Sequence, residues 1–393
     1  MSIKTSDRIA RVKPSPTLAV TALAQQLRAE GRDVVGLAAG EPDFDTPDHI
    51  KAAAKQAIDD GKTKYTAVDG TPGLKQAIIN KFERDNGLSY QADQILVSVG
   101  GKQAFYNMCM ALLDEGDEVI IPAPYWVSYP DIVKLAEGTP VIIEGDQSQE
   151  FKITAAQLEA AITDKTKLFV LNSPSNPTGK AYTIAELKAL GEVLAKYPHV
   201  VITTDDIYEH IVWTDEGFNN LLNVCPELTD RTLVMNGVSK GYSMTGWRIG
   251  YTGGPAEVIK GMKKVQSQST SNPTSISQYA AEAALNGPQD FLADMCGVFK
   301  ERHDFVLASC NAMDGVDCLP SDGTFYSFPS FQGVIDRLDG ISNDVELAQY
   351  LLEKAEVAAV PGSAFGLEGH LRFSYATSMK NLEKALDRIA KAI

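Results

Sequence analysis

The chain has 393 residues, 44% hydrophobic and 22% charged, a composition typical of a soluble globular enzyme that argues against a disordered or fibrous protein. Its length fits one large α/β domain and a smaller second domain. The formal net charge of −15 provides no basic field to attract nucleic acid or anionic lipid, so we expect neither partner.

The N-terminal sequence and the cysteines indicate a soluble, cytoplasmic protein. The first residues lack the apolar core of a signal peptide, and no run of about 18 apolar residues could span a bilayer. The cysteines form no CxxC pair and no spacing typical of zinc ligands, so we predict no metal site. We expect reduced, mostly buried thiols at Cys109, Cys225, Cys296, Cys310 and Cys318.

Residues 1–45 form an N-terminal arm that we expect to pack with the smaller domain or to reach a second subunit. The arm contains a predicted helix from Leu18 to Glu30. Two more helices are predicted after Thr46-Pro47 and Thr71-Pro72, where a capping hydroxyl precedes a proline at the first helical position.

Residues 46–290 are predicted to form the large domain. Short apolar runs rich in β-branched residues mostly alternate there with amphipathic helices, such as that from Ile184 to Lys196. This alternation predicts a mainly parallel, seven-stranded sheet covered by helices on both faces. We expect its strands at Ile95 to Val99, Glu118 to Ile121, Val141 to Ile143, Leu168 to Leu171, Val200 to Thr203, Leu233 to Met235 and Arg248 to Tyr251.

Residues 291–393 are predicted to form a smaller α+β domain, because the regular alternation ends there. A long helical stretch runs from about Gln289 to Met313. The later elements are expected to be the helix Asp344 to Ala355, the strands Val357 to Val360 and His370 to Tyr375, and a terminal helix from Lys380.

Four polar motifs directly follow predicted strands of the large domain. Ligands of open parallel sheets bind outside the carboxyl ends of the strands, so these motifs point to one shared cleft. They are Gly100-Gly101-Lys102, Ser173-Pro-Ser-Asn176-Pro-Thr-Gly179, Asp205-Asp-Ile-Tyr208 and Ser239-Lys240.

The pair Gly100-Gly101 opens a predicted helix, whose first backbone N–H groups could bind a phosphate. A Gly-Gly pair alone more often marks only a strand-to-helix turn. A nucleotide P-loop is disfavoured, because Gly101-Lys102 is followed by Gln103 in place of Ser or Thr. No GxGxxG motif follows the first strand, which disfavours a dinucleotide cofactor.

Asp205 ends an apolar strand, where an unpaired carboxylate is costly, and a protonated ring nitrogen would suit it as a partner. The alternative role is a helix-capping aspartate, the role that we favour for Asp206. Tyr208 and Asn176 could both hydrogen-bond a phenolic oxygen on the same ring.

Lys240 lies between a predicted strand and the run Met244-Thr-Gly-Trp, with Arg248 eight positions further on. A solvated surface lysine is the commonest alternative. Desolvation and the nearby arginine would lower the amine pKa towards neutrality. Such an amine suits covalent bonding to a phosphorylated aldehyde cofactor.

These motifs together resemble the pyridoxal-phosphate-dependent aminotransferases of fold type I. The resemblance extends over nearly the whole chain and points to the bacterial class I aspartate aminotransferase branch, which also includes prephenate aminotransferases. It is carried by RVKPSPT (11–17), AAGEPDFDTP (38–47), KYTAVDGTPGLKQAI (64–78), VGGKQA (99–104), PAPYWVSYP (122–130), SPSNPTG (173–179), DDIY (205–208), SKGYSMTGWRIGY (239–251) and LRFSYATS (371–378).

The resemblance implies the α/β fold of these transferases, pyridoxal 5′-phosphate as cofactor and Lys240 as its covalent anchor and proton carrier. Asp205 would pair with the ring nitrogen, Asn176 and Tyr208 would bond the phenolic oxygen, and Trp126 would stack on the ring. The phosphate region would be lined by Gly100, Gly101, Lys102, Ser239 and Arg248, unless Lys102 faces the substrate instead.

The same resemblance implies a homodimer with shared active sites, in which Tyr65 reaches the phosphate of the neighbouring subunit. Arg372 would clamp the substrate α-carboxylate, with Gly40, Asn176 and Trp126 beside it. The arginine that reads the distal carboxylate in dicarboxylate-specific relatives is replaced here by Ser267. The remaining candidates for that task are Lys13, Ser15, Thr17 and Lys102.

The leading functional hypothesis is an aspartate:2-oxoglutarate aminotransferase with a ping-pong mechanism, with prephenate as a candidate additional substrate. The nearest alternative is a broad aromatic, alanine or kynurenine aminotransferase. An alternative from another enzyme class is a C–S lyase or decarboxylase that uses the same cofactor and lysine. A regulator that kept the fold as a sensor is a non-enzymatic alternative.

Overall fold

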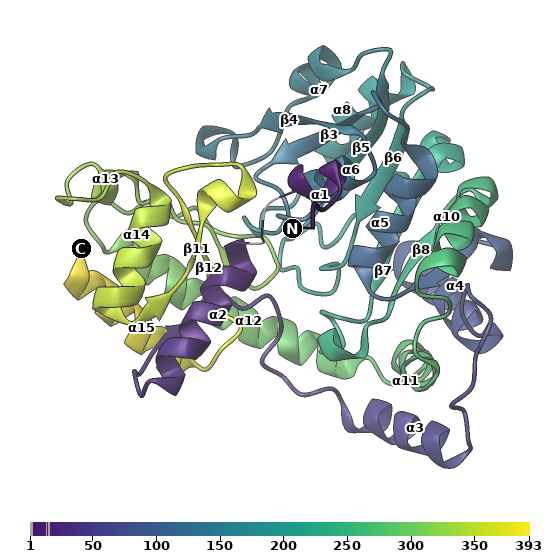
Figure 1. Cartoon of the computed structure of the whole chain (residues 1–393), viewed down its shortest axis with the longest axis horizontal. Coiled ribbons are helices and arrows are strands. Elements are labelled where there is room, and N and C mark those ends of the chain that lie inside the picture. The colour runs from purple at the N-terminus through teal and green to yellow at the C-terminus, as the bar shows by residue number, and fades with distance from the viewer. Residues whose placement is uncertain (1–2, 13, 15) are drawn as a thin grey trace.

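The computed structural model describes residues 3–12, 14 and 16–393, without the side chains of residues 16–18. In this part of the chain, a seven-stranded sheet with the order β2-β8-β7-β6-β5-β3-β4 forms the centre of the larger part (Figure 1). Its strands are β2 (Ile95–Ser98), β3 (Glu118–Ala123), β4 (Thr139–Glu144), β5 (Thr166–Asn172), β6 (Val201–Asp205), β7 (Thr232–Gly237) and β8 (Gly250–Gly253).

The sheet is mainly parallel, as the sequence predicts, and only β8 runs antiparallel to its neighbours β2 and β7. Alternating residues of each strand enter two separate hydrophobic cores: Ile95 and Val97 point to one face, and Leu96 points to the other. Helices cover both faces, which explains why most strands carry apolar residues on both sides.

The hydrophobic core on one face includes residues of α3 (Asp48–Asp59), α4 (Pro72–Asn86), α7 (Ala155–Ala161), α8 (Ile184–Ala195), α9 (Leu221–Val224) and α11 (Ser275–Asn286). The other face packs against α5 (Gly101–Leu112), α6 (Tyr129–Leu135) and α10 (Ala256–Ser269). Short 3-10 helices connect these elements at η1 (Ala92–Gln94), η2 (Gln147–Gln149), η3 (Pro226–Arg231) and η4 (Thr245–Trp247).

The C-terminal part has its own hydrophobic core. Its antiparallel sheet has the order β11-β12-β9, and a parallel pair joins β1 to β10. The strands are β1 (Val35–Gly36), β9 (Tyr326–Ser327), β10 (Val357–Ala358), β11 (Val360–Pro361) and β12 (Leu371–Ser374). The later helices are α12 (Asp290–Asn311), α13 (Gln332–Ile335), α14 (Asp344–Tyr350), the π-helix η5 (Leu351–Ala355), the 3-10 helix η6 (Gly362–Phe365) and α15 (Met379–Ala392).

The N-terminal arm contacts both parts of the molecule. Helix α1 (Asp7–Ala10) contacts α6, and Arg8 forms an ion pair with Glu137 at 2.9 Å. Helix α2 (Pro16–Ala29) contacts β10 and β11, and Figure 1 shows it beside the C-terminal helices. The predicted domain boundaries at residues 45 and 290 stay a prediction.

Three local predictions need correction. Thr46 does not cap α3, because the helix begins at Asp48 and its N-cap position is Pro47; the Thr46 hydroxyl donates to the backbone oxygen of Ser243 at 2.6 Å. The last central strand begins at Gly250, since Arg248 has a left-handed backbone with φ of 57°. The predicted strand from Val357 to Val360 is divided between β10 and β11, which belong to different sheets.

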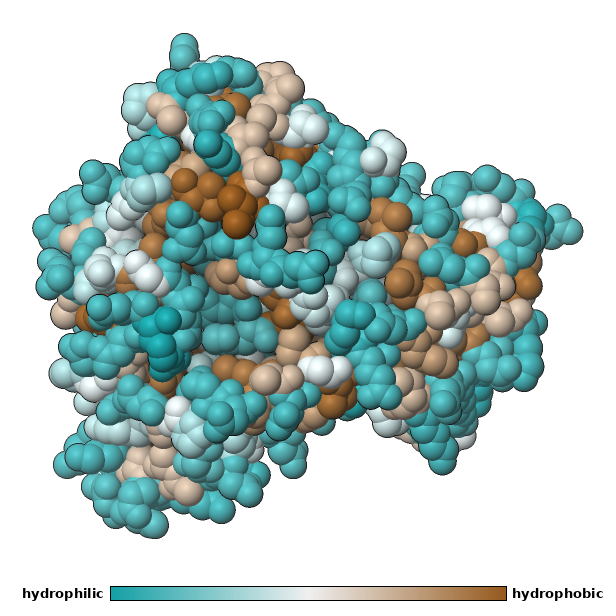
Figure 2. Space-filling model, turned by 180° about the vertical axis from the view of Figure 1, so that it is seen from behind, coloured by the Kyte–Doolittle hydropathy of each residue, from teal (hydrophilic) through white to brown (hydrophobic). Residues whose placement is uncertain are grey.

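The molecular surface seen in Figure 2 is mostly hydrophilic, with small separate hydrophobic patches. Within residues 3–12, 14 and 16–393, every helix is too short or too polar to cross a lipid bilayer. The described cysteines are all unpaired thiols, and all but Cys296 are buried, as predicted.

Candidate active site

A cleft of about 500 Å³ opens at the carboxyl ends of the central strands, between the central sheet and the small sheet. It brings together most of the residues that the sequence singles out. These are Gly40, Gly101, Lys102, Trp126, Asn176, Asp205, Tyr208, Ser239, Lys240, Arg248 and Arg372.

A few predicted site residues do not line this cleft. Gly100 lies directly behind it, against the Arg248 guanidinium. Tyr65 is 91% exposed and lies away from the cleft of its own chain. Lys13, Ser15 and the side chain of Thr17 lie outside the described residues.

Lys240 follows β7 and is partly buried within the cleft. Its ammonium donates a hydrogen bond to the backbone oxygen of Gly40 and lies 5.9 Å from the ring centre of Tyr208. Burial, and next the positive charge of Arg372, lower the pKa of Lys240 to about 8. The amine is therefore neutral far more often near pH 8 than an ordinary lysine.

Asp205 ends β6 and presents its carboxylate to the cleft. Tyr129 donates a hydrogen bond to Asp205 Oδ2 at 2.6 Å, and Asn172 Nδ2 donates to the Asp205 backbone oxygen at 2.8 Å. Burial raises the pKa of Asp205, while the Tyr129 hydrogen bond opposes that rise. A cationic partner in the cleft would therefore stabilise the charged form of this carboxylate.

An anion-binding corner forms where α5 begins. Gly100, with φ of 81°, caps this helix, whose first N–H groups have no partner within the helix. A β-carbon on Gly100 would lie 2.2 Å from Arg248 Nη2, so glycine is required for the guanidinium to lie there. Arg248 is held by the Thr245 backbone oxygen at 2.8 Å, and Ser239 lines the same cleft.

Arg372 lies on β12 and is only 2% exposed. It donates to Asn176 Oδ1 at 3.0 Å and to the Ala38 backbone oxygen at 2.9 Å, and its guanidinium lies 4.4 Å from the Tyr326 ring centre. Its buried Nε has no hydrogen-bond partner among the described residues. A rigid guanidinium in the cleft wall suits a carboxylate.

Lys102 and Trp126 lie together on one side of the cleft, with the Lys102 ammonium 5.2 Å from the Trp126 ring centre. Burial, and next the charge of Arg248, lower the pKa of Lys102. Tyr129 meets Trp126 edge to face at 5.2 Å. Lys102 thus adds a further cation to the cleft, close enough to Arg248 for the two charges to interact.

Sequence reasoning missed Tyr129, Asn172, Glu41 and Tyr326. Asn172 could have been found, since it is the last residue of β5 and so reaches the same sheet edge as Asp205. Glu41 accepts a hydrogen bond from the Thr245 hydroxyl at 2.7 Å. That contact and those of Tyr129 and Tyr326 depend on packing between distant segments, which local sequence patterns do not show.

Known proteins are similar to this chain in sequence and in structure over its full length. The family model described as aminotransferase class I and II matches residues 32–389. The aspartate/prephenate aminotransferase of Nitrosomonas europaea is 58% identical over all of both chains. The aspartate aminotransferase of Rhizobium meliloti is 54% identical over 98% of this chain and 95% of that protein.

Solved structures agree with these sequence matches. An aspartate aminotransferase from Rhizobium meliloti has a TM-score of 0.96 at 53% identity, over 100% of this chain and 99% of that chain. The aspartate aminotransferase from Thermus thermophilus with maleate has a TM-score of 0.94 at 42% identity, over all of both chains. Together with the family match, these similarities show that the chain belongs to the class I and II aminotransferases.

Proposed function

We propose that the cleft binds pyridoxal 5′-phosphate and that the chain transfers the amino group of aspartate to 2-oxoglutarate, with prephenate as a further acceptor. The observation that carries the proposal is the convergence of Lys240, Asp205 and Arg372 in one cleft from distant parts of the chain. Each supplies a different function that amino-group transfer on this cofactor needs: an amine, an anion for the ring and a cation for the substrate.

The cleft fits the cofactor at both ends. The phosphate suits the corner formed by Arg248, Ser239 and the beginning of α5, where the missing β-carbon of Gly100 leaves room for the guanidinium. The ring nitrogen, when protonated, suits the Asp205 carboxylate. Asn176 and Tyr208 remain the candidates for the phenolic oxygen, and Trp126 for stacking on the ring.

Lys240 performs the proton transfers. Its ε-amine would hold the cofactor, and the same nitrogen would remove the proton from the substrate Cα. A pKa of about 8 allows this nitrogen to accept and release a proton near neutral pH. When bound, pyridoxal 5′-phosphate supplies an electron sink for the charge left on Cα.

Arg372 is the proposed clamp for the substrate α-carboxylate, oriented by Asn176 and Ala38. The dicarboxylate preference is supported by the names of the relatives and by the maleate in the Thermus thermophilus structure. Ser267 lies near the end of α10 and donates to the Lys264 backbone oxygen at 2.7 Å. The other cations that line the cleft already have proposed roles, at the substrate α-carboxylate, at the phosphate and in proton transfer. Lys102 is the lining cation that remains for the distal carboxylate.

The proposed active unit is a homodimer. Tyr65 is nearly fully exposed and does not line the cleft of its own chain. A residue that contributes to the active site of a neighbouring subunit should have both properties. Sedimentation of the purified protein should give twice the 42.5 kDa chain mass, whereas a monomer with full activity would contradict this part of the proposal.

A coupled assay tests the activity. Aspartate with 2-oxoglutarate should yield oxaloacetate and glutamate, and turnover with phenylalanine or alanine as donor should be slower. Higher turnover on phenylalanine would favour the broad-specificity alternative. Product formed from an amino acid without any 2-oxo-acid acceptor would indicate the lyase or decarboxylase.

A further inference from the structure

The turn after β6 presents its side chains in two opposite directions. Asp205 and Tyr208 line the cleft, whereas Asp206 and Glu209 are buried on the other side. Two backbone hydrogen bonds close the turn: the Glu209 N–H donates to the Asp206 oxygen at 3.0 Å, and the Ile211 N–H donates to the Tyr208 oxygen at 2.8 Å.

A charged cluster lies behind this turn, against the end of α4. Lys81 on α4 is fully buried, and its ammonium forms an ion pair with Glu209. Asn86 connects the two side chains, since it accepts from Lys81 at 2.7 Å and donates to Glu209 at 2.8 Å. Burial alone would raise the pKa of Glu209, but the charges of Lys81 and His210 lower it to about 2.

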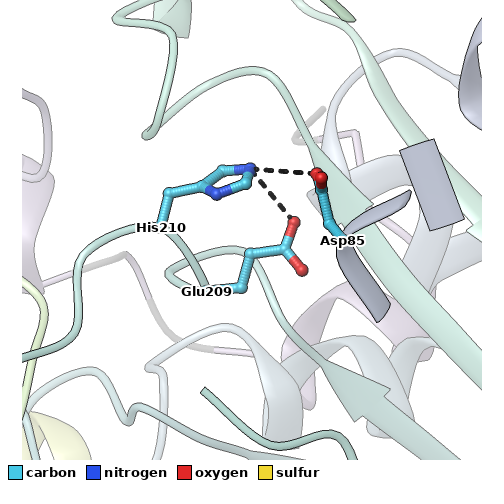
Figure 3. Close-up of side chains that lie close together, drawn as sticks. All are labelled: Asp85, Glu209 and His210. Atoms are coloured by element: carbon cyan, nitrogen blue, oxygen red, sulfur yellow. Dashed lines mark ion pairs between the residues drawn. The ribbon is translucent and has the colours of Figure 1, made fainter. Parts of the chain in front are cut away.

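Figure 3 shows Asp85, Glu209 and His210 directed towards one another. One oxygen or nitrogen atom from each side chain lies within 4.8 Å of the others, a spacing also found in metal sites. The Lys81 ammonium pairs with Glu209 and lies 3.9 Å from Asp85 Oδ2. The chain itself therefore supplies the cation that balances these carboxylates, and the cluster is an internal ion-pair network.

The network also contacts the segment that carries Lys240. A β-carbon on Gly241 would lie 3.0 Å from His210 Cδ2, so the His210 ring packs directly against the residue after Lys240. The Tyr242 ring meets His210 edge to face at 5.9 Å. The cluster therefore contacts the turn after β6 and the segment that carries Lys240. These two segments line the part of the cleft proposed for the cofactor ring.

We propose that Glu209, through its buried ion pair with Lys81, is a positioning residue that fixes Asp205 and Tyr208 for the cofactor ring. This inference rests on the proposed function, because it concerns the binding of pyridoxal 5′-phosphate in the same cleft. Neither Glu209 nor Lys81 lines the cleft, so both act only through the turn.

The physical reason is the cost of an unpaired charge in a dry interior. Without the Glu209 carboxylate, the fully buried Lys81 ammonium loses its counter-ion. The structure can relieve that cost by releasing the turn from α4. Because Tyr208 directly precedes Glu209 and Asp205 is four residues before it, such a movement displaces both cleft residues together.

The test compares Glu209→Gln with the double variant Lys81→Met/Glu209→Gln. Removing the carboxylate alone should raise the dissociation constant of pyridoxal 5′-phosphate at least about tenfold. It should also speed hydrogen exchange at the N–H groups of Glu209 and Ile211 in the cofactor-free chain. The double variant removes both charges, and its cofactor affinity should return towards that of the unsubstituted protein.

Glu186→Gln is the matched control. This substitution weakens the ion pair of another buried lysine, Lys152. It should leave the capping box at the beginning of α8 intact, because glutamine can replace glutamate in a capping box. This variant should keep the cofactor affinity of the unsubstituted protein. If Glu209→Gln binds the cofactor equally well and exchanges at the same rate, the proposal is overturned, even if its melting temperature falls.

A second variant covers the case in which Glu209→Gln does not fold. Glu209→Asp keeps the charge but shortens the side chain by one methylene, which moves the carboxylate away from Lys81. We therefore expect a smaller rise in the cofactor dissociation constant and a smaller increase in the hydrogen-exchange rate. Unchanged affinity and exchange in Glu209→Asp would then overturn the proposal. If instead the unsubstituted protein binds no cofactor, the proposed function itself fails, which separates the two results.

Discussion

Tyr129 donates a hydrogen bond to Asp205 across 2.6 Å, from the beginning of α6 to the end of β6. Burial, and next the charge of Asp205, raise the pKa of Tyr129 well above its usual range, so the hydroxyl keeps its proton as a donor. The contact stabilises the charged form of Asp205 in a site where burial opposes it.

Tyr129→Phe should therefore raise the pKa of Asp205 further and weaken its pairing with the cofactor ring. A hydrogen bond to a charged group contributes about 1.5–3 kcal/mol, so kcat should fall roughly tenfold or more. Steady-state kinetics with aspartate as donor measure the effect. Tyr90→Phe is the control, because the buried Tyr90 hydroxyl has no hydrogen-bond partner among the described residues; an equal fall in both variants would contradict the assigned role.

Gly100→Ala should weaken cofactor binding. The added β-carbon would lie 2.2 Å from Arg248 Nη2, and the backbone φ of 81° disfavours any side chain. The guanidinium must then move away from the phosphate corner, which should raise the cofactor dissociation constant about tenfold or more, as measured by titration of the cofactor-free protein. Gly297→Ala provides the comparison, because nothing lies within 4 Å of its added β-carbon, and it should bind normally.

Arg372→Lys should raise the KM for every amino-acid substrate. Lysine keeps the charge but loses the planar fork that Asn176 and the Ala38 oxygen orient. Loss of a bidentate contact of about 2 kcal/mol corresponds to a change of about 30-fold in kcat/KM. Arg388→Lys, at the surface ion pair with Asp33, should leave kcat/KM unchanged. A loss confined to dicarboxylic substrates would contradict the role of Arg372 as the α-carboxylate clamp.

Lys102→Ala should discriminate between substrates. The Lys102 ammonium lines the cleft near Trp126 and is available for a distal carboxylate once Arg372 holds the α-carboxylate. We expect kcat/KM for aspartate to fall about tenfold, with a much smaller change for phenylalanine. Equal losses for both substrates would instead place Lys102 at the phosphate, the other role that the sequence leaves open.

The sequence located the sheet well because its strands are short apolar runs, and four of these runs are followed by a polar motif. Asp205 and Lys240 both follow such runs, and the structure places both in one cleft. The antiparallel direction of β8 could not be read from its residues, since a fully buried strand has the same apolar pattern in either direction.

Tyr129 and Lys81 show why sequence reasoning did not find the contacts behind the cleft. Tyr129 contacts Asp205 across 76 positions of the chain, and Lys81 pairs with Glu209 across a much longer stretch of the chain. Each looks locally like an ordinary helix residue. Their roles appear only when α4 and α6 are packed against the sheet, because neither the periodicity of a helix nor its capping residues specifies such contacts.

The covalent bond between Lys240 and the cofactor is tested most directly by reductive trapping. The protein is incubated with pyridoxal 5′-phosphate, reduced with borohydride and digested, and the modified peptide is identified by mass spectrometry. Because the pKa of Lys240 is about 8, trapping should become faster as the pH rises from 7 to 9 and then level off. We expect the added mass on Lys240, with loss of the visible absorption band and of transamination in Lys240→Ala. Modification at other lysines only, or full activity of Lys240→Ala, would contradict the proposed chemistry.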